Sequence, residues 1–411
     1  MATLILKIIV VILIADYLLE RLLDYLNASR RTAQLPAELE GIYDAEKYRQ
    51  AMDYDREKSR LSLISSSLSL AAMLFMLLSG GFAWLDQLWR NYTDSPVWLA
   101  VLFFGSLGLA ADLLFTPVAV YRTFVLEEKY GFNKTTPRTF IFDKLKGWLL
   151  GALIGGGLLA LITWIYTVTE DHFWLYAWAA IGGFTIFMTM FYSDLIVPLF
   201  NKQTPLEEGP LRGKIEAFAR KAGFKIKNIY VMDGSKRSTK ANAYFTGFGA
   251  RKRIVLFDTL IRDHTEDELV SILAHEIGHY KKHHIITGMV LSLLQTGLML
   301  FLMNYFLTWP ELSLALGATE PSFHLGLLSF ALIYGPFSMI LGLLMNMISR
   351  RNEFAADRFA ALNAGAASLK EALKKLSVNH LSNLTPHPAY VFFYYSHPPL
   401  LERLKALDEV A

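Results

Sequence analysis

Seven long apolar segments constrain the fold of this 411-residue chain more than any other feature. A helix that crosses the hydrocarbon core of a bilayer needs about 20 mostly apolar residues. The segments that meet or approach this length are 3–24, 61–85, 97–120, 147–168, 173–200, 285–308 and 323–348. Hydrophobic residues make up 53% of the chain and charged residues only 19%, a balance too apolar for a soluble protein of this size. We therefore predict a mainly α-helical protein built on a bundle of seven transmembrane helices.

The first apolar segment is predicted to be a retained membrane span. Its basic start consists only of Lys7, it contains Asp16 and Glu20, and no small-residue cleavage site follows it. A secretory signal peptide would show a basic start, an uninterrupted apolar core and such a cleavage site.

The distribution of basic residues between the spans predicts their orientation. The connections 30–60 and 122–146 are rich in Lys and Arg, whereas 86–96 has only Arg90 and 309–322 has neither residue type. Basic connections stay on the cytoplasmic side of a membrane. We expect an N-terminus outside the cytoplasm, and a cytoplasmic location for the first, third and fifth connections and for the C-terminal tail. The membrane would be the endoplasmic reticulum in a eukaryote or the inner membrane in a bacterium.

The fifth connection is the only one long enough to fold by itself. Helical periodicity covers 211–222 and Gly223 follows as a C-terminal cap. Three strands are expected at 226–232, 241–248 and 253–258, the last two joined as a hairpin through 249–252. The predicted organisation has four parts. Residues 1–200 form spans one to five with their loops, and 201–284 form a cytoplasmic α+β metallopeptidase segment. Residues 285–348 form spans six and seven, and 349–411 form a cytoplasmic helical segment that completes the zinc site.

A His-Glu-x-x-His motif at 275–279 carries the predicted chemistry. Thr265 and Glu268 form a capping box that starts a helix running through this motif. Within a helix, His275 and His279 lie one turn apart on the same face and can bind one Zn²⁺ ion. Glu276 is then expected to act as general base beside that ion. The alternative is a polar helix face that carries these residues by accident.

Two histidines leave a catalytic zinc ion without its third protein ligand. The chain has no cysteine, and Lys282 and Ile285 stand where a longer Gly- and His-containing zinc motif would continue. We expect Glu353 to begin a new helix after span seven and to be the third ligand. Asp357, one turn later, would accept a hydrogen bond from a ligating imidazole.

Two further histidines follow the motif directly and are rival ligands. Three histidines on one straight helix do not readily converge on one ion, so we favour a different interpretation for His283 and His284. Together with the preceding lysines, they would mark the lipid–water boundary where the helix enters span six.

The chain resembles the zinc-dependent CaaX prenyl endopeptidases, a family of membrane-embedded gluzincins, over nearly its whole length. The segments that carry the resemblance are the His275–His279 motif, Glu353-x-x-x-Asp357, Glu127–Lys134, Ser235–Ser238, Asn242–Phe245 and Ser396–Leu404. The resemblance implies that the spans surround a water-filled chamber faced by the zinc site. It also implies removal of the C-terminal tripeptide from prenylated CaaX proteins.

The same resemblance suggests roles for residues outside the zinc motif. Asn242 and Ala243 would belong to an edge strand that binds the substrate backbone; the alternative is an internal strand. His397 would stabilise the oxyanion or hold the substrate, and Arg403 would support the site.

Two other functions stay open at this point. The same chemistry could serve a broader quality-control protease for membrane proteins. A non-enzymatic seven-span transporter or receptor would carry the motif without zinc or hydrolysis. A nucleic-acid partner is not expected, because the net charge is only +3. The expected partners are the lipid bilayer and a peptide or protein substrate.

Overall fold

The computed structural model describes residues 1–411 except 33, 36, 225–227, 248–252 and 411. Seven helices in this part of the chain are long and apolar enough to cross a membrane, which confirms the predicted number of spans. They are α1 (Ala2–Ser29), α2 (Ala45–Leu78), α4 (Pro96–Tyr121), α5 (Pro137–Leu150) continued by α6 (Gly157–Thr169), α7 (Phe173–Leu195), α12 (His284–Leu307) and α14 (Phe323–Ala364).

Two of the spans contain π-helical turns. One such turn, η2 (Arg122–Glu127), continues α4, and the other, η3 (Gly151–Gly156), joins α5 to α6. A π-helical turn widens the helix locally and is often found near functional sites.

The second span differs from its predicted bounds. The helix α2 already begins at Ala45, because its polar first half has good helix formers although its hydropathy is low. It ends at Leu78, and Gly80 takes up a left-handed conformation with φ of 73°. A separate helix, α3 (Gly81–Arg90), then covers the residues predicted to finish the span.

The bounds of two site-bearing helices also correct the prediction. We expected Glu353 to begin a new helix after span seven, but α14 is one continuous helix of 42 residues from Phe323 to Ala364. Conversely, the helix with the His-Glu-x-x-His motif does not run straight into span six. It ends at Lys281, and His283 has a left-handed φ of 59° before α12 begins at His284.

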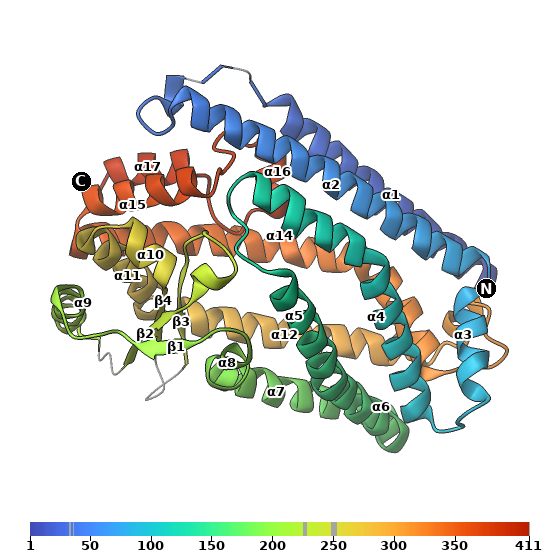
Figure 1. Ribbon diagram of the computed structural model, residues 1–411. Coiled ribbons are helices and arrows are strands. Elements are labelled where there is room, and N and C mark those ends of the chain that lie inside the picture. The colour runs from blue at the N-terminus through green and yellow to red at the C-terminus, as the bar shows by residue number, and fades with distance from the viewer. Residues whose placement is uncertain (33, 36, 225–227, 248–252, 411) are drawn as a thin grey trace.

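A four-stranded sheet lies at one end of the helices, opposite α3 and the N-terminus (Figure 1). The strand order is β1-β2-β4-β3, with β1 (Gln203–Pro205), β2 (Asn228–Met232), β3 (Ala243–Thr246) and β4 (Arg253–Phe257). The strands β2 and β4 are parallel, and β3 pairs antiparallel with β4. The predicted turn at 249–252 lies outside the described residues. Among the strands of the described residues, β3 pairs only with β4, so its other edge is open.

The remaining helices are shorter, and several of them pack beside the sheet or follow α14. They are α8 (Val197–Phe200), α9 (Pro210–Lys221), α10 (Asp258–Asp263), α11 (Glu266–Lys281), α13 (Glu311–Ala315), α15 (Ala366–Asn379), α16 (Pro388–Tyr394) and α17 (Leu400–Asp408), with 3₁₀ turns at η1 (Ala37–Leu39), η4 (Glu170–His172) and η5 (Gly234–Lys236). Two predicted caps are confirmed. Gly223 has a φ of 60° after α9, and Thr265 and Glu268 form the complete capping box of α11.

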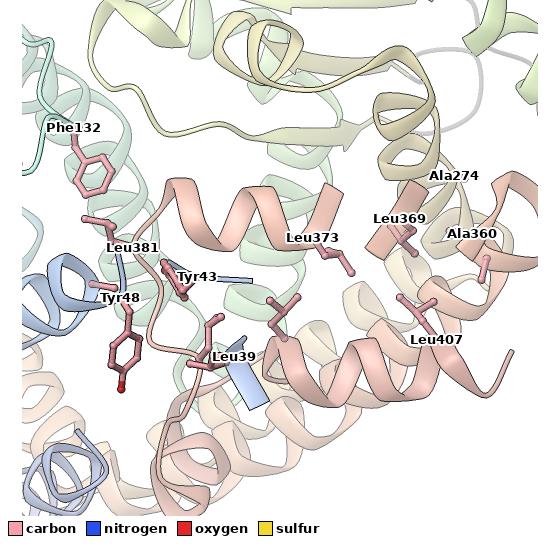
Figure 2. Close-up of a cluster of buried hydrophobic side chains, with 14 of the residues drawn as sticks. Leu39, Tyr43, Tyr48, Phe132, Ala274, Ala360, Leu369, Leu373, Leu381 and Leu407 are labelled. Carbon is pink, nitrogen blue, oxygen red and sulfur yellow. The ribbon is translucent and has the colours of Figure 1, made fainter. Parts of the chain in front are cut away.

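A buried apolar cluster joins the first connection to the site end of the molecule (Figure 2). Its labelled members come from α11, α14, α15, α17, the segments before and within α2, and the connections after η2 and α15: Leu39, Tyr43, Tyr48, Phe132, Ala274, Ala360, Leu369, Leu373, Leu381 and Leu407. Burial of these side chains is the main force holding the segments together. The cluster therefore fixes α11 relative to α14 and the tail.

The helices α11 and α14 lie close together at Gly278. A methyl group on this residue would lie 3.2 Å from both Cα and the carbonyl oxygen of Ala356 and 3.2 Å from a ring carbon of Phe359. The Ala356 atoms are backbone and cannot rotate away. The glycine is thus required by the short distance between the two helices.

Replacing Gly278 with Ala should push α11 away from α14. Overpacking of this kind costs about 1–3 kcal/mol, so the apparent melting temperature of the purified protein in detergent should fall. The control is Gly213→Ala in α9, where no atom lies within 4 Å of the added carbon. Because alanine is the better helix former, this control should be neutral or slightly stabilising. Equal melting temperatures for Gly278→Ala and the wild type would contradict the packing argument.

Candidate metal centre

The helix α11 presents His275 and His279 side by side. Their ring centroids are 4.8 Å apart, and their Nε2 atoms are separated by 3.1 Å. The capping box satisfies the first N–H groups of this helix, and acidic residues in its first turn favour the helix dipole. The local sequence thus stabilises a helix in which four-residue spacing brings both imidazoles to one point.

Glu353 of α14 completes a cluster with these two rings. One carboxylate oxygen lies 3.4 Å from His275 Nε2, and the other lies 3.2 Å from His279 Nε2. The carboxylate is buried, with only 5% of its side chain exposed. Among the described residues, His275, His279 and Glu353 form a group whose ligand atoms could bind a metal ion. The structure therefore brings together the three residues that the sequence proposed as ligands.

The chemistry of this cluster fits a divalent cation. Glu353 Oε2 is buried and has no hydrogen-bond partner among the described residues, which is costly for a carboxylate oxygen. Burial opposes the charged form of His275, but the neighbouring carboxylates of Asp357 and Glu353 outweigh it and raise the pKa of the ring to about 9. The negative potential that favours a proton on this ring would equally favour a metal ion. Imidazole and carboxylate donors, with no cysteine, suit zinc.

Asp357 and Arg403 orient His275 from behind. His275 Nδ1 donates a hydrogen bond to Asp357 Oδ1 over 2.8 Å. Arg403, on α17, donates from Nε and Nη2 to the two oxygens of the same carboxylate over 2.7 and 2.6 Å. All three groups are largely buried. With Nδ1 engaged, His275 directs the lone pair of Nε2 towards Glu353 and His279, which is the orientation a metal ligand needs.

His284, the first residue of α12, supports the second histidine, a contact that the sequence did not predict. Its Nδ1 lies 3.1 Å from His279 Nδ1. This contact depends on the break at His283, which turns α12 back so that its first side chain reaches the preceding helix. His284 therefore contacts the outer side of the cluster, opposite the Nε2 atom of His279.

Glu276 lies in a pocket of about 190 Å³ beside the cluster, together with His397 and Arg403. Its carboxylate makes no hydrogen bond or ion pair with any described residue, so it is free to exchange a proton. Burial raises its pKa. A carboxylate with a raised pKa beside a metal site is suited to general acid–base chemistry.

His397 enters the same pocket from the loop before α17. Its Nε2 lies 3.4 Å from Glu353 Oε1, while 63% of its side chain is exposed. Ser396 Oγ lies 3.0 Å from its Nδ1.

Asn242 and Ala243 lie at the start of the edge strand β3 and also line this pocket. Because β3 is the last strand in the sheet order, the alternative that this segment is an internal strand is wrong. Their position is held by a contact that the sequence did not predict: Ala241 N donates a hydrogen bond to His380 Nε2 over 3.0 Å. Burial lowers the pKa of His380 to about 4, so the ring stays neutral and can accept this bond.

Two further segments that carried the family resemblance, 127–134 and 235–238, contact each other next to the edge strand. Lys240 Nζ donates to Glu127 Oε2 over 2.8 Å, and backbone bonds join Lys134 to Arg237 and Thr239 to Phe132. The two segments 127–134 and 235–238, far apart in the sequence, thus form one support. The structure gives these motifs a positioning role.

Comparison with known proteins agrees with this geometry. Residues 24–202 match the family described as "CAAX prenyl protease N-terminal, five membrane helices", and residues 205–411 match peptidase family M48. A protein of Schizosaccharomyces pombe named "Probable CAAX prenyl protease 1" is 37% identical over 95% of this chain and 85% of its own length. The human "CAAX prenyl protease 1 homolog" is 32% identical over 92% of this chain and 89% of its own length.

A solved structure shares the whole architecture. The crystal structure of S. mikatae Ste24p superposes with a TM-score of 0.94 at 34% sequence identity, covering 98% of this chain and 99% of that one. Both family matches, the full-length relatives and this superposition lead to the same assignment. The chain belongs to peptidase family M48 and is an integral-membrane metallopeptidase of the kind represented by the CAAX prenyl protease 1 proteins.

Proposed function

We propose that this protein is a zinc endopeptidase that removes the C-terminal tripeptide of prenylated CaaX proteins. The observation that carries the proposal is the meeting of His275, His279 and Glu353 beside a pocket that also contains Glu276 and the start of an edge strand. The names of the full-length relatives support the substrate class.

Zinc would be held by the Nε2 atoms of both histidines and by the Glu353 carboxylate. A zinc ion bound there supplies Lewis acidity, which polarises the scissile carbonyl and makes water a nucleophile at neutral pH. Asp357 and Arg403 keep His275 in the tautomer that leaves its Nε2 free. The arrangement matches catalytic zinc sites with three protein ligands.

The chain's own residues would then handle the proton and the developing charge. Glu276 accepts a proton from the attacking water and passes it to the leaving amine, a task suited to its unpaired carboxylate. We assign His397 to the oxyanion. With Ser396 O–H donating to Nδ1, the Nε2–H of His397 is a donor directed into the pocket.

The free edge of β3 would bind the substrate backbone. An extended peptide can add to an open strand edge through main-chain hydrogen bonds, independently of its side chains. Asn242 and Ala243 lie where that edge meets the pocket with Glu276, so an added strand would run past the zinc ligands.

The site would face the cytoplasm. The basic connections 30–60 and 122–146 lie at the sheet end of the helices (Figure 1), and basic connections stay on the cytoplasmic side. We retain the four-part division at 200, 284 and 348, with the sheet segment and the tail forming the cytoplasmic part. A metal site at this membrane face suits substrates that are themselves tethered to lipid.

A substrate comparison tests the proposal. The purified protein should cleave a farnesylated CaaX peptide with a higher kcat/KM than the same peptide without the lipid. Equal values would contradict prenyl specificity and favour the broader membrane-protein protease. No cleavage of either peptide by zinc-loaded protein would exclude both enzymes.

Replacing Glu276 with Gln should abolish turnover and leave metal binding intact. The substitution removes the proton acceptor but no ligand, so kcat should fall by at least about 10²-fold. Elemental analysis should still find one zinc ion per chain. Near-wild-type activity in this variant would remove Glu276 from its assigned role.

Replacing Asp357 with Asn should weaken metal binding by about 10–100-fold, because His275 loses its charged hydrogen-bond partner. Competition with a zinc chelator measures this change. The control is Asp408→Asn, which removes an exposed ion pair with Lys370 and should leave affinity unchanged. Equal chelator resistance in the wild type and Asp357→Asn would show that this hydrogen bond does not orient the ligand.

A further inference from the structure

A second pocket adjoins the one that contains Glu276. Its volume is about 300 Å³, and its lining is largely polar. The two pockets share His380 and His397 among their lining residues, so the second pocket lies directly beside the one that contains Glu276. The residues that line the second pocket are Tyr54, Asp55, Lys58, Ser377, His380, Leu381, Ser382, Asn383, Leu384, Tyr395, His397, Pro398, Pro399 and Leu400.

Lys58 is the unneutralised charge in this second pocket. It is solvent-exposed and forms no hydrogen bond or ion pair with any described residue. The nearby carboxylates are already engaged: Asp55 pairs with Arg31 over 2.7 Å, and Glu127 pairs with Lys240 over 2.8 Å. A lysine on an outer surface needs no partner, but Lys58 lines a pocket that adjoins the metal site. An anion is the ligand that such a group attracts.

Tyr54 places Lys58 close to the start of the edge strand. The Nζ atoms of Lys58 and Lys240 lie 5.1 and 5.2 Å from the centroid of the Tyr54 ring. Lys240 is only three residues before Ala243, where β3 begins. The unpaired ammonium group therefore lies beyond the N-terminal end of β3.

This position determines which end of a bound peptide reaches Lys58. A peptide added antiparallel to β3 runs from Thr246 towards Ala243, so its C-terminal residues pass Asn242 and approach Lys240. An added parallel strand would instead bring an N-terminus there, and its ammonium group would be repelled. Antiparallel pairing is also slightly more stable per residue. The C-terminal side of the cleaved bond thus faces the second pocket.

We propose that Lys58 binds the C-terminal carboxylate of the substrate in this pocket and so sets the cut a short distance from the chain end. The inference rests on the proposed function and deepens it, because it gives a physical reason for cleavage near a free C-terminus. No chemistry occurs at Lys58. It forms a charge-assisted contact that is lost when the released peptide departs.

The test compares two farnesylated CaaX peptides, one with a free C-terminal carboxylate and one with a C-terminal amide. The wild type should cleave the carboxylate form with a kcat/KM roughly 10- to 100-fold higher, mainly through KM, because the contact is made in both ground and transition states. Lys58→Met should lower kcat/KM for the carboxylate form to the level of the amide. Lys58→Arg should restore most of the preference, since the positive charge returns.

The matched control is Lys214→Met. This lysine lies on α9, outside the lining of both pockets, and pairs with Glu266 and Asp267 of α11. The variant should keep the wild-type preference. Equal cleavage of both peptides by the wild type, or an undiminished preference in Lys58→Met, would overturn the role of Lys58 while leaving the proposed function intact. Failure of the wild type to cleave either peptide would overturn the proposed function and this inference with it.

Discussion

The contact between α11 and α14 is the interaction on which the rest of the site depends. At Gly278 a methyl group would lie only 3.2 Å from the backbone of Ala356 on the other helix. That distance brings Glu353, one turn before Asp357 on α14, to within 3.2–3.4 Å of two imidazole nitrogens on α11. Asp357 then reaches the far side of His275, and Arg403 closes the arrangement from α17. The two helices are held in place by the apolar cluster shared with α15, α17 and the segment before α2.

The membrane helices and the site are coupled through segments that lie far apart in the sequence. The π-helical turn that continues the third span ends at Glu127, which binds Lys240, three residues before the edge strand. Arg237, in the neighbouring turn, is bound by Asp143 of the fourth span. The edge strand is therefore anchored to the membrane helices and to His380 of the tail. A substrate strand added there would lie at a fixed height relative to both the metal ligands and the bilayer.

Much of this architecture could be predicted from local sequence, because the relevant signals are short-range. Apolar length predicted seven spans, the capping box predicted α11, and four-residue spacing predicted both the His275–His279 pair and the Glu353–Asp357 pair. Helix bounds were harder to predict where a helix extends into polar residues with high helix propensity. The helix α14 continues through polar residues after 348, and α2 begins well before its apolar part. The partners His284, His380 and Lys58 carry no periodic signal. Their contacts depend on a helix break at His283 and on the packing of distant segments.

The most direct test of the account is a crystal structure of the purified protein measured at the zinc absorption edge. The account predicts a single anomalous peak within bonding distance of His275 Nε2, His279 Nε2 and the Glu353 carboxylate, with Asp357 still bound to His275 Nδ1. The absence of any peak from catalytically active crystals, or a peak bound by other residues with Glu353 turned away, would contradict it.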